Sequence, residues 1–225
     1  MTYWRIAIVA SLMMLVGQAS AQEELRRFKL TPVEQMSPAQ RQYFDAMMSG
    51  PVSGTGSSAV VSGAKNLGAP FNVYLRSPEL AEVLRKLGEQ IRFKSSLPTK
   101  LNEFAILITA RHWGAQYEWF AHHRLALKAG LDPAIAAELA LGHRPQGMNA
   151  QELAIYNFSH ELHHNHEVSD ASYKAVLDLF GERGVVDLIA VNGYYVFVSM
   201  ILNVDRTPLP AGVTPPLSPL SANHH

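Results

Sequence analysis

The chain has 225 residues, of which 48% are hydrophobic and 17% charged, so it can bury a sizeable core and is neither disordered nor fibrous. Its 19 Lys and Arg residues balance 19 Asp and Glu residues, and no basic run stands out, which argues against nucleic acid as a partner. The chain has no cysteine, so disulfides and thiol chemistry are excluded.

The first 21 residues have the features of a secretory signal peptide. Arg5 supplies a positive charge, residues 6–16 form an apolar run that is short for a membrane span, and Ala19-Ser20-Ala21 has the small residues of a cleavage site. We therefore expect a mature chain that begins at Gln22 and is exported to a periplasm or secreted, with no membrane attachment after cleavage. The alternative is an uncleaved anchor.

Helical signals recur along the rest of the chain, whereas no convincing strand pattern or internal repeat is present. After an N-terminal extension over residues 22–36, Ser37, Pro38 and Gln40 supply an N-cap, a first-turn proline and a capping-box partner. These signals predict a helix that runs to about Gly50.

A segment rich in glycine and serine follows, over residues 50–72. So long a segment without regular structure is either a disordered linker or a functional loop. Because it ends in the apolar stretch 70–74, we favour a loop that acts as a lid over a site.

Two helices are expected next. Ser77-Pro78 opens the first, whose apolar residues are spaced for one buried stripe: Leu80, Val83, Leu84, Leu87 and Ile91. Pro98 opens the second, in which residues 104–110 are apolar all round, as in a central, buried helix. Gly114 interrupts it, and a further helix is expected from just past Gly114 to Gly130.

The remaining segments also carry helix signals. Asp132-Pro133 opens a helix that ends at Gly142, and an Asn149–Glu152 capping box opens one that runs to about His164. Ser169 caps a helix that stops at Gly181, and residues 185–202 form the last and most apolar one. The proline-rich tail, 207–225, is expected to run extended. The prediction is an all-α bundle of about six to eight helices, with its domain over residues 37–206.

The most informative stretch contains Glu118 and His122, which lie four residues apart and so share one face of a helix. A carboxylate beside an imidazole can transfer protons. Trp113 and Tyr117 add apolar bulk nearby, the setting in which such groups acquire shifted pKa values. The alternative is a surface pair, which would stabilise the helix by only about 0.2 to 0.5 kcal/mol.

The order of these residues resembles a known family. Leu97-Pro98-x-x-Leu101-x-Glu103 is followed by an apolar run, then by residues 113–123, Trp-Gly-Ala-Gln-Tyr-Glu-Trp-x-x-His-His, and by Gly130. This pattern is similar to the carboxymuconolactone decarboxylase family, whose fold is that of the alkylhydroperoxidase AhpD. The likeness covers roughly residues 71–210, and residues 103–130 are its specific part.

In the AhpD branch, a Glu lies twelve residues before a Cys-x-x-Cys pair, and a His lies four residues after the second Cys. By position, Glu103 matches that Glu and His122 matches that His, while Ala115 and Glu118 take the places of the two cysteines. Thiol peroxidase activity is therefore disfavoured. The resemblance instead implies the decarboxylase-type branch, which works by acid/base catalysis without a cofactor.

On this resemblance, His122 is expected to act as general acid with Glu118 as its partner. Glu103 would lie at the preceding helix level, as a proton relay or as a structural residue. His123 points about 100° away from His122 on a helix, so we expect it to face solvent or a neighbouring subunit.

The resemblance also implies a site that binds the substrate. The fork of Arg111 would hold a substrate carboxylate, unless it forms a salt bridge to a helix terminus or to Glu103. Trp113, Tyr117 and Tyr194 are expected to contact the substrate.

One competing motif lies near residue 160. His160-Glu161-Leu162-His163-His164 fits the His-Glu-x-x-His pattern of zinc hydrolases, and Glu182 could supply a third ligand. The pattern is short, the Gly and His of its longer form are missing, and no sheet is expected to hold a peptide. We favour instead histidines that stabilise the end of a helix.

The sequence therefore predicts a cofactor-free acid/base enzyme, a decarboxylase, other lyase or isomerase, that acts on a small cyclic carboxylic acid or lactone. Members of this family assemble as trimers or hexamers, and the apolar segment 185–202 independently favours burial against another subunit. A homotrimer or homohexamer is expected. The alternative is a non-catalytic protein of the same fold that binds a small apolar ligand.

Overall fold

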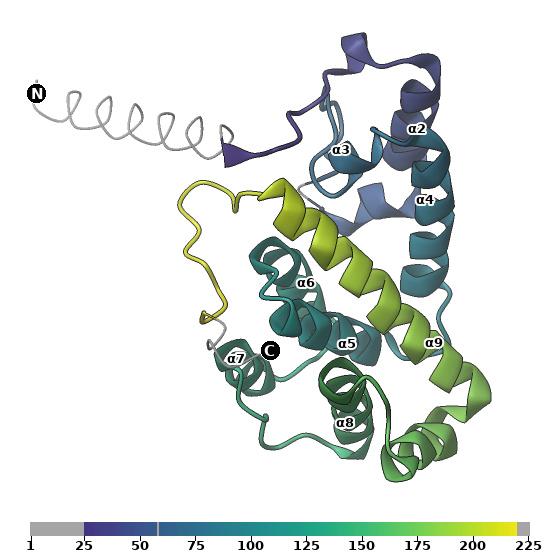
Figure 1. Ribbon diagram of the computed structural model, residues 1–225, viewed down its shortest axis with the longest axis vertical. Helices are drawn as coiled ribbons and strands as arrows, with labels where there is room; N and C mark the ends of the chain where they lie inside the picture. The colour runs from purple at the N-terminus through teal and green to yellow at the C-terminus, as the bar shows by residue number, and fades with distance from the viewer. Residues whose placement is uncertain (1–24, 58, 220–225) are drawn as a thin grey trace, which may run out of the picture.

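The computed structural model describes residues 25–57 and 59–219, and within these ranges every regular element is helical (Figure 1). The all-α prediction is confirmed. The expected signal peptide, residues 1–21, lies outside the described residues. In chain order the elements are η1 (Val33–Gln35), α2 (Pro38–Ser49), η2 (Pro51–Thr55), α3 (Phe71–Tyr74), α4 (Pro78–Phe93), α5 (Thr99–His112), α6 (Gln116–Lys128), α7 (Pro133–Leu141), α8 (Ala150–Asn165) and α9 (Asp170–Asp205).

Helices α2, α7, α8 and α9 begin after residues whose side chains cap them, whereas Ser77 makes no such hydrogen bond at α4. The Ser37 side chain accepts from the backbone N–H of Gln40, and the Gln40 side chain accepts from the N–H of Ser37, which completes a capping box at α2. Asn149 and Glu152 form the same reciprocal pair at α8. Each box satisfies two backbone donors that the first helical turn leaves without an acceptor.

Helix α5 is the centre of the larger hydrophobic cluster. Every residue from 101 to 110 is buried, as its apolar sequence predicts. It packs against α6, α8 and α9, so it meets other helices on all sides. Phe104 of α5, Trp119 of α6 and Phe158 of α8 are among the largest side chains in this cluster.

A smaller hydrophobic cluster lies at the other end of the protein, where α2, α3, α4 and the loop between α2 and α3 meet. Helix α9 runs across both groups of helices (Figure 1), and Tyr194 contacts both clusters. Gly181 interrupts α9 with a backbone φ of 68° and ψ of 178°. The predicted helix break at Gly181 is therefore a kink, after which the chain turns helical again.

The predicted buried stripe of α4 is wrong in part. Leu84 and Ile91 are buried as expected, but Leu80, Val83 and Leu87 are among the exposed large apolar residues. The buried face instead includes Gly88, because a Cβ there would lie 2.6 Å from the Tyr194 hydroxyl of α9. A helix that approaches a tyrosine this closely must turn a residue without a side chain toward it.

Both ends of the described chain pack against the bundle. Asp205, fully buried at the end of α9, accepts from the backbone N–H of Phe28 at 3.0 Å and lies 3.4 Å from Arg26. The described part of the proline-rich tail, residues 207–219, runs without regular structure, and Leu217 exchanges backbone hydrogen bonds of 3.0 Å with the Gln116 side chain. The segments that flank the domain thus hold its termini in place.

Among the described helices, only α9 is long and apolar enough to cross a membrane. The core helix of a soluble protein has the same composition, and 44% of the most apolar window of α9 is buried inside the protein. Length and hydropathy are therefore weak evidence for a span.

Candidate active site

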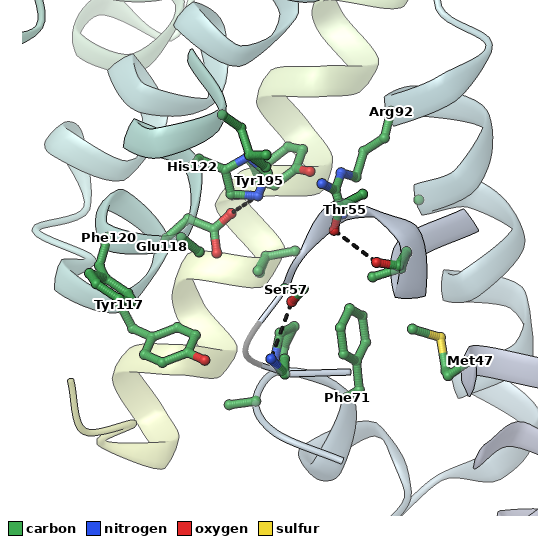
Figure 2. Close-up of a pocket in the computed structure, with 18 of the residues that line it drawn as sticks. Met47, Thr55, Ser57, Phe71, Arg92, Tyr117, Glu118, Phe120, His122 and Tyr195 are labelled. Carbon is green, nitrogen blue, oxygen red and sulfur yellow. Dashed lines mark hydrogen bonds and ion pairs between the residues drawn. The ribbon is translucent and has the colours of Figure 1, made fainter. Parts of the chain in front are cut away.

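A cavity of about 180 Å³ lies where the two hydrophobic clusters meet. Its lining comes from α4, α6, α9 and the loop between α2 and α3. Figure 2 shows Glu118, His122 and Tyr195 on one side of the cavity, with Phe71 and Met47 across from them. The cavity thus has a polar, titratable wall and an apolar wall.

His122 lies between two carboxylates. Its Nδ1 is 2.6 Å from Oε2 of Glu103 on α5, and its Nε2 is 3.2 Å from Oε1 of Glu118, one turn earlier on α6. All three side chains are buried. The edge of the ring also meets Tyr195 at a centroid distance of 5.1 Å. The structure therefore brings together the three residues that the sequence predicts for proton transfer.

The two contacts of His122 differ in kind. A carboxylate only accepts, so Nδ1 donates to Glu103 in a short, charge-assisted hydrogen bond that orients the ring. The contact to Glu118 lacks hydrogen-bond geometry and is an ion pair only when the imidazole is protonated, and Oε1 of Glu118 has no hydrogen-bond partner among the described residues. Nε2 and Oε1 are thus the atoms placed to exchange a proton with a ligand.

Burial is the main influence on Glu118. It raises the pKa of this carboxyl, while the charges of His122 and Arg92 lower it in part and that of Glu103 raises it further. A carboxyl with a raised pKa holds its proton at a higher pH than an exposed one does. Groups of this kind serve as general acids near neutral pH.

Arg92 of α4 is a site residue that the sequence analysis missed. Its side chain lines the cavity, its guanidinium points toward Tyr195 (Figure 2), and its Nε has no hydrogen-bond partner among the described residues. Burial opposes its charge, but Tyr195, Glu103 and Glu118 outweigh that effect and raise its pKa above the ordinary value. The cavity therefore contains a permanent positive charge.

Tyr117 and Tyr194, which the sequence analysis expects to contact a substrate, both line the cavity. The Tyr194 hydroxyl donates to the backbone oxygen of Leu84 at 3.3 Å, and burial raises its pKa to about 12. Tyr195 is more deeply buried and its pKa is raised as well, mainly by that burial. Both phenols therefore stay neutral near pH 7.

Arg111 and Trp113 do not belong to this cavity. Arg111 lies eight residues after Glu103 on the same helix, which places it about 12 Å further along the axis. There it lines a second cavity and donates from Nη1 to the backbone oxygen of Ser218 at 2.5 Å. Trp113 follows the end of α5 and is not among the residues that line the cavity of His122.

The glycine- and serine-rich loop forms one wall of the cavity. Val52, Thr55 and Ala59 are among its lining residues. Arg124 of α6 donates to the backbone oxygens of Thr55 at 3.2 Å and Gly56 at 3.3 Å, which ties the loop to the helix that carries His122. The loop therefore lies against the cavity, and its action as a lid stays a prediction.

The zinc motif takes on structural roles. The rings of His160 and His164 stack face to face at a centroid distance of 4.0 Å, and Glu161 accepts from Ser169 and Ser172 at the start of α9. Within the described ranges, no three His, Asp or Glu side chains are grouped so that they could hold a metal ion. Glu182 is exposed on α9 and joins no such group.

Comparison with known proteins identifies no relative: no family model matches the chain, and neither a curated protein nor a solved structure matches it significantly. The resemblance to the carboxymuconolactone decarboxylase family therefore rests on the sequence motif.

Proposed function

We propose that this protein is a cofactor-free acid/base enzyme of the carboxymuconolactone decarboxylase type, acting on a small cyclic carboxylic acid or lactone. The observation that carries the proposal is the buried position of His122 between Glu103 and Glu118 at the edge of a cavity. A surface Glu/His pair would be exposed to solvent and would not border a cavity. Two buried carboxylates around one imidazole are instead suited to moving a proton.

The cavity suits a small ring that bears a negative charge. A cavity of roughly 150 Å³ accommodates a ligand the size of benzene, and this one is about 180 Å³. Phe71 and Phe120 supply apolar surface for the ring. Arg92 takes the role for which the sequence favoured Arg111, because its guanidinium lies at this cavity. A planar guanidinium matches the two oxygens of a carboxylate.

A decarboxylation can be written with these groups. The bond between the ring carbon and the carboxyl carbon breaks, carbon dioxide leaves, and the electron pair is delocalised into the unsaturated ring. A proton from His122, the general acid, then forms the new C–H bond, while Glu118 stands beside it as its partner and Glu103 keeps the imidazole oriented. Solvent returns a proton to the pair. An isomerisation would use the same pair to move a proton between two carbons.

The test is turnover of unsaturated lactone acids and cyclic carboxylic acids, followed by mass spectrometry of substrate and product. We expect His122→Gln and Glu118→Gln to lower kcat by about 10²-fold or more while the protein stays folded. The matched control is His123→Gln, because His123 stacks on Trp119 and does not line the cavity. It should keep normal turnover.

A non-catalytic binding protein would give a different result. Such a protein would bind a ligand of this class, show no turnover in any form, and lose only stability in the two variants. That outcome would overturn the enzymatic proposal and leave the cavity as a binding site.

We further propose self-association as a homotrimer or homohexamer. The support is apolar surface on two helices, where Val83 of α4 is 61% exposed and Val186 of α9 is 62% exposed. Sedimentation equilibrium of the full chain tests the number of subunits. A monomer at micromolar concentration would contradict the proposal, and Val186→Lys should weaken an oligomer if α9 forms the contact.

Export is proposed on the sequence of residues 1–21 alone. Fractionation of the producing cells, with N-terminal sequencing of the purified protein, tests it directly. A mature N-terminus at Gln22 in the exported fraction is expected, and an intact N-terminus in the cytoplasmic fraction would contradict it.

A further inference from the structure

A second cavity, of about 70 Å³, lies between α5, α7 and α8, at the end of α5 opposite to the one that carries Glu103. Apart from the phenol of Tyr156, its ionisable lining groups are all of the kind that can carry a positive charge. None of its lining residues in the described part of the chain carries a carboxylate. The side chains that can bear a positive charge are Arg111, His112, His143, His160 and His164.

Arg111 supplies the permanent charge. Within the described ranges it forms no ion pair, and its hydrogen bond is to the neutral backbone oxygen of Ser218. Its guanidinium lies close against Gly142, where a Cβ would come within 2.6 Å of Nη2. Gly142 caps α7 with a φ of 83°, so both its conformation and this contact favour glycine. The fold thus holds a guanidinium at the cavity, and no carboxylate of the described residues neutralises it.

The imidazoles form a continuous row beside this charge. His160 stacks on His164, the ring centroid of His112 lies 4.9 Å from that of His164, and His163 stacks on His112 at 5.0 Å. Nδ1 of His164 donates to the backbone oxygen of His160 at 2.9 Å, which fixes the proton on that nitrogen when the ring is neutral. Protonation of any ring in the row therefore adds positive charge next to other rings that can also be charged.

The acidic groups around the row are committed elsewhere. Glu138 of α7 pairs with His143 at the exposed rim, at 3.0 Å, and Glu161 of α8 bonds to the start of α9. Arg144 adds positive charge over the ring of Tyr156. Burial, His164 and Arg144 lower the pKa of His160, while Glu161 raises it. A bound anion would offset this repulsion, so proton uptake and anion binding should favour each other.

We infer that this cavity is a binding site for a small oxyanion of the phosphate or sulfate class. Arg111 provides the charge that is present at every physiological pH, and the imidazole N–H groups provide donors that become more numerous on acidification. The size of the cavity suits a free inorganic anion, and a phosphate monoester would have to extend through its open side. The site is separate from the cavity of His122, so the inference does not depend on the proposed enzymatic activity.

The test is calorimetric titration of the full chain with sodium sulfate and with inorganic phosphate, at constant ionic strength. Sulfate keeps its charge across the range, so its affinity should rise several-fold between about pH 7.5 and pH 6 only if protein groups take up protons. Arg111→Gln and His160→Gln should each weaken binding, the former by about tenfold or more, since a charge-assisted hydrogen bond is lost. Glycerol phosphate, as a third ligand, distinguishes a monoester from the free anion.

Two control variants localise the site. His166→Asn changes an exposed histidine at the C-cap of α8, where φ is 62° and asparagine is well tolerated, and should leave binding unchanged. His122→Gln should also leave it unchanged. If Arg111→Gln fails to fold, His160→Gln carries the test alone. Sulfate affinity that is unaffected in folded Arg111→Gln and His160→Gln, absence of binding at 10 mM anion, or loss of binding in His122→Gln would each overturn the inference.

Discussion

His163 should make the protein sensitive to mild acid. This side chain is buried between α5 and α9, and its Nε2 lies 3.0 Å from the Thr109 hydroxyl. Burial, followed by the charges of His112 and other nearby histidines, lowers the pKa of His163 to about 4, although Asn192 raises it in part. An unfolded chain would bind a proton on His163 at the ordinary value of 6.5, so acid favours the unfolded state.

The size of the effect follows from the two pKa values. In the folded protein, His163 resists protonation between pH 6.5 and about pH 4. The stability that its neutral form contributes is therefore fully present above this window and is lost as the pH falls through it. A difference of this size corresponds to a loss of about 2 kcal/mol at pH 5 and about 3 kcal/mol near pH 4. That is a large share of the 5 to 15 kcal/mol of a typical domain.

Urea unfolding at about pH 7, 6, 5 and 4.5 measures this loss in the wild-type chain and in His163→Gln. Other groups titrate in the same range, so the informative quantity is the difference between the two proteins. We expect the variant to start less stable at pH 7 and to lose about 2 kcal/mol less than the wild type by pH 5. A parallel loss in both proteins would refute the reasoning, and His166→Asn serves as the control for an exposed histidine.

The remaining predictions concern two buried carboxyl groups. Burial raises the pKa of Glu118 above the ordinary value of 4.5. The contribution of this carboxyl to stability is therefore complete below pH 4.5 and is lost as the pH rises through the raised pKa. Glu118→Gln should therefore gain stability relative to the wild type as the pH rises above 4.5, by about 1.4 kcal/mol for each tenfold change in the ionisation equilibrium; a difference independent of pH would contradict this. Asp205→Ala removes the buried carboxylate that pairs with Arg26 and accepts from the N–H of Phe28, and should cost about 3 to 5 kcal/mol in urea unfolding. The control is Asp45→Ala, which removes an exposed pair with Arg41 and should cost less than about 1 kcal/mol; equal losses would be inconsistent with the proposed role of Asp205.

Local signals in the sequence were sufficient to predict the helices and part of the site. Capping residues such as Ser37 and Asn149 mark helix starts because they satisfy backbone donors within a few residues. The apolar run of α5 predicts a central helix, since no other position buries all its faces. The spacing of Glu118 and His122 also predicts their contact, because residues four apart lie about one helical turn from each other.

Features that depend on distant segments could not be predicted in this way. The buried face of α4 is decided by the approach of Tyr194 to Gly88, and these residues lie more than one hundred positions apart. The leucines and valines of α4 predict one buried stripe, but the face that the structure buries is a different one. Arg92 joins the site only in the rotation that packing against α9 selects, so a polar residue in a polar stretch gave no signal. Arg111 falls outside the site because eight residues along a helix carry it to another cavity.

Incorporation of deuterium from solvent tests the central claim, that His122 and its two carboxylates transfer a proton to carbon. A lactone acid or cyclic carboxylic acid that the enzyme converts is allowed to react in D₂O. The product is then analysed by mass spectrometry for deuterium at the carbon that lost the carboxyl group. We expect one deuterium per product molecule with the wild-type chain and with His123→Gln, and formation of this product about 10²-fold more slowly, or slower still, with His122→Gln. Formation of the labelled product at the same rate in His122→Gln as in His123→Gln would contradict it.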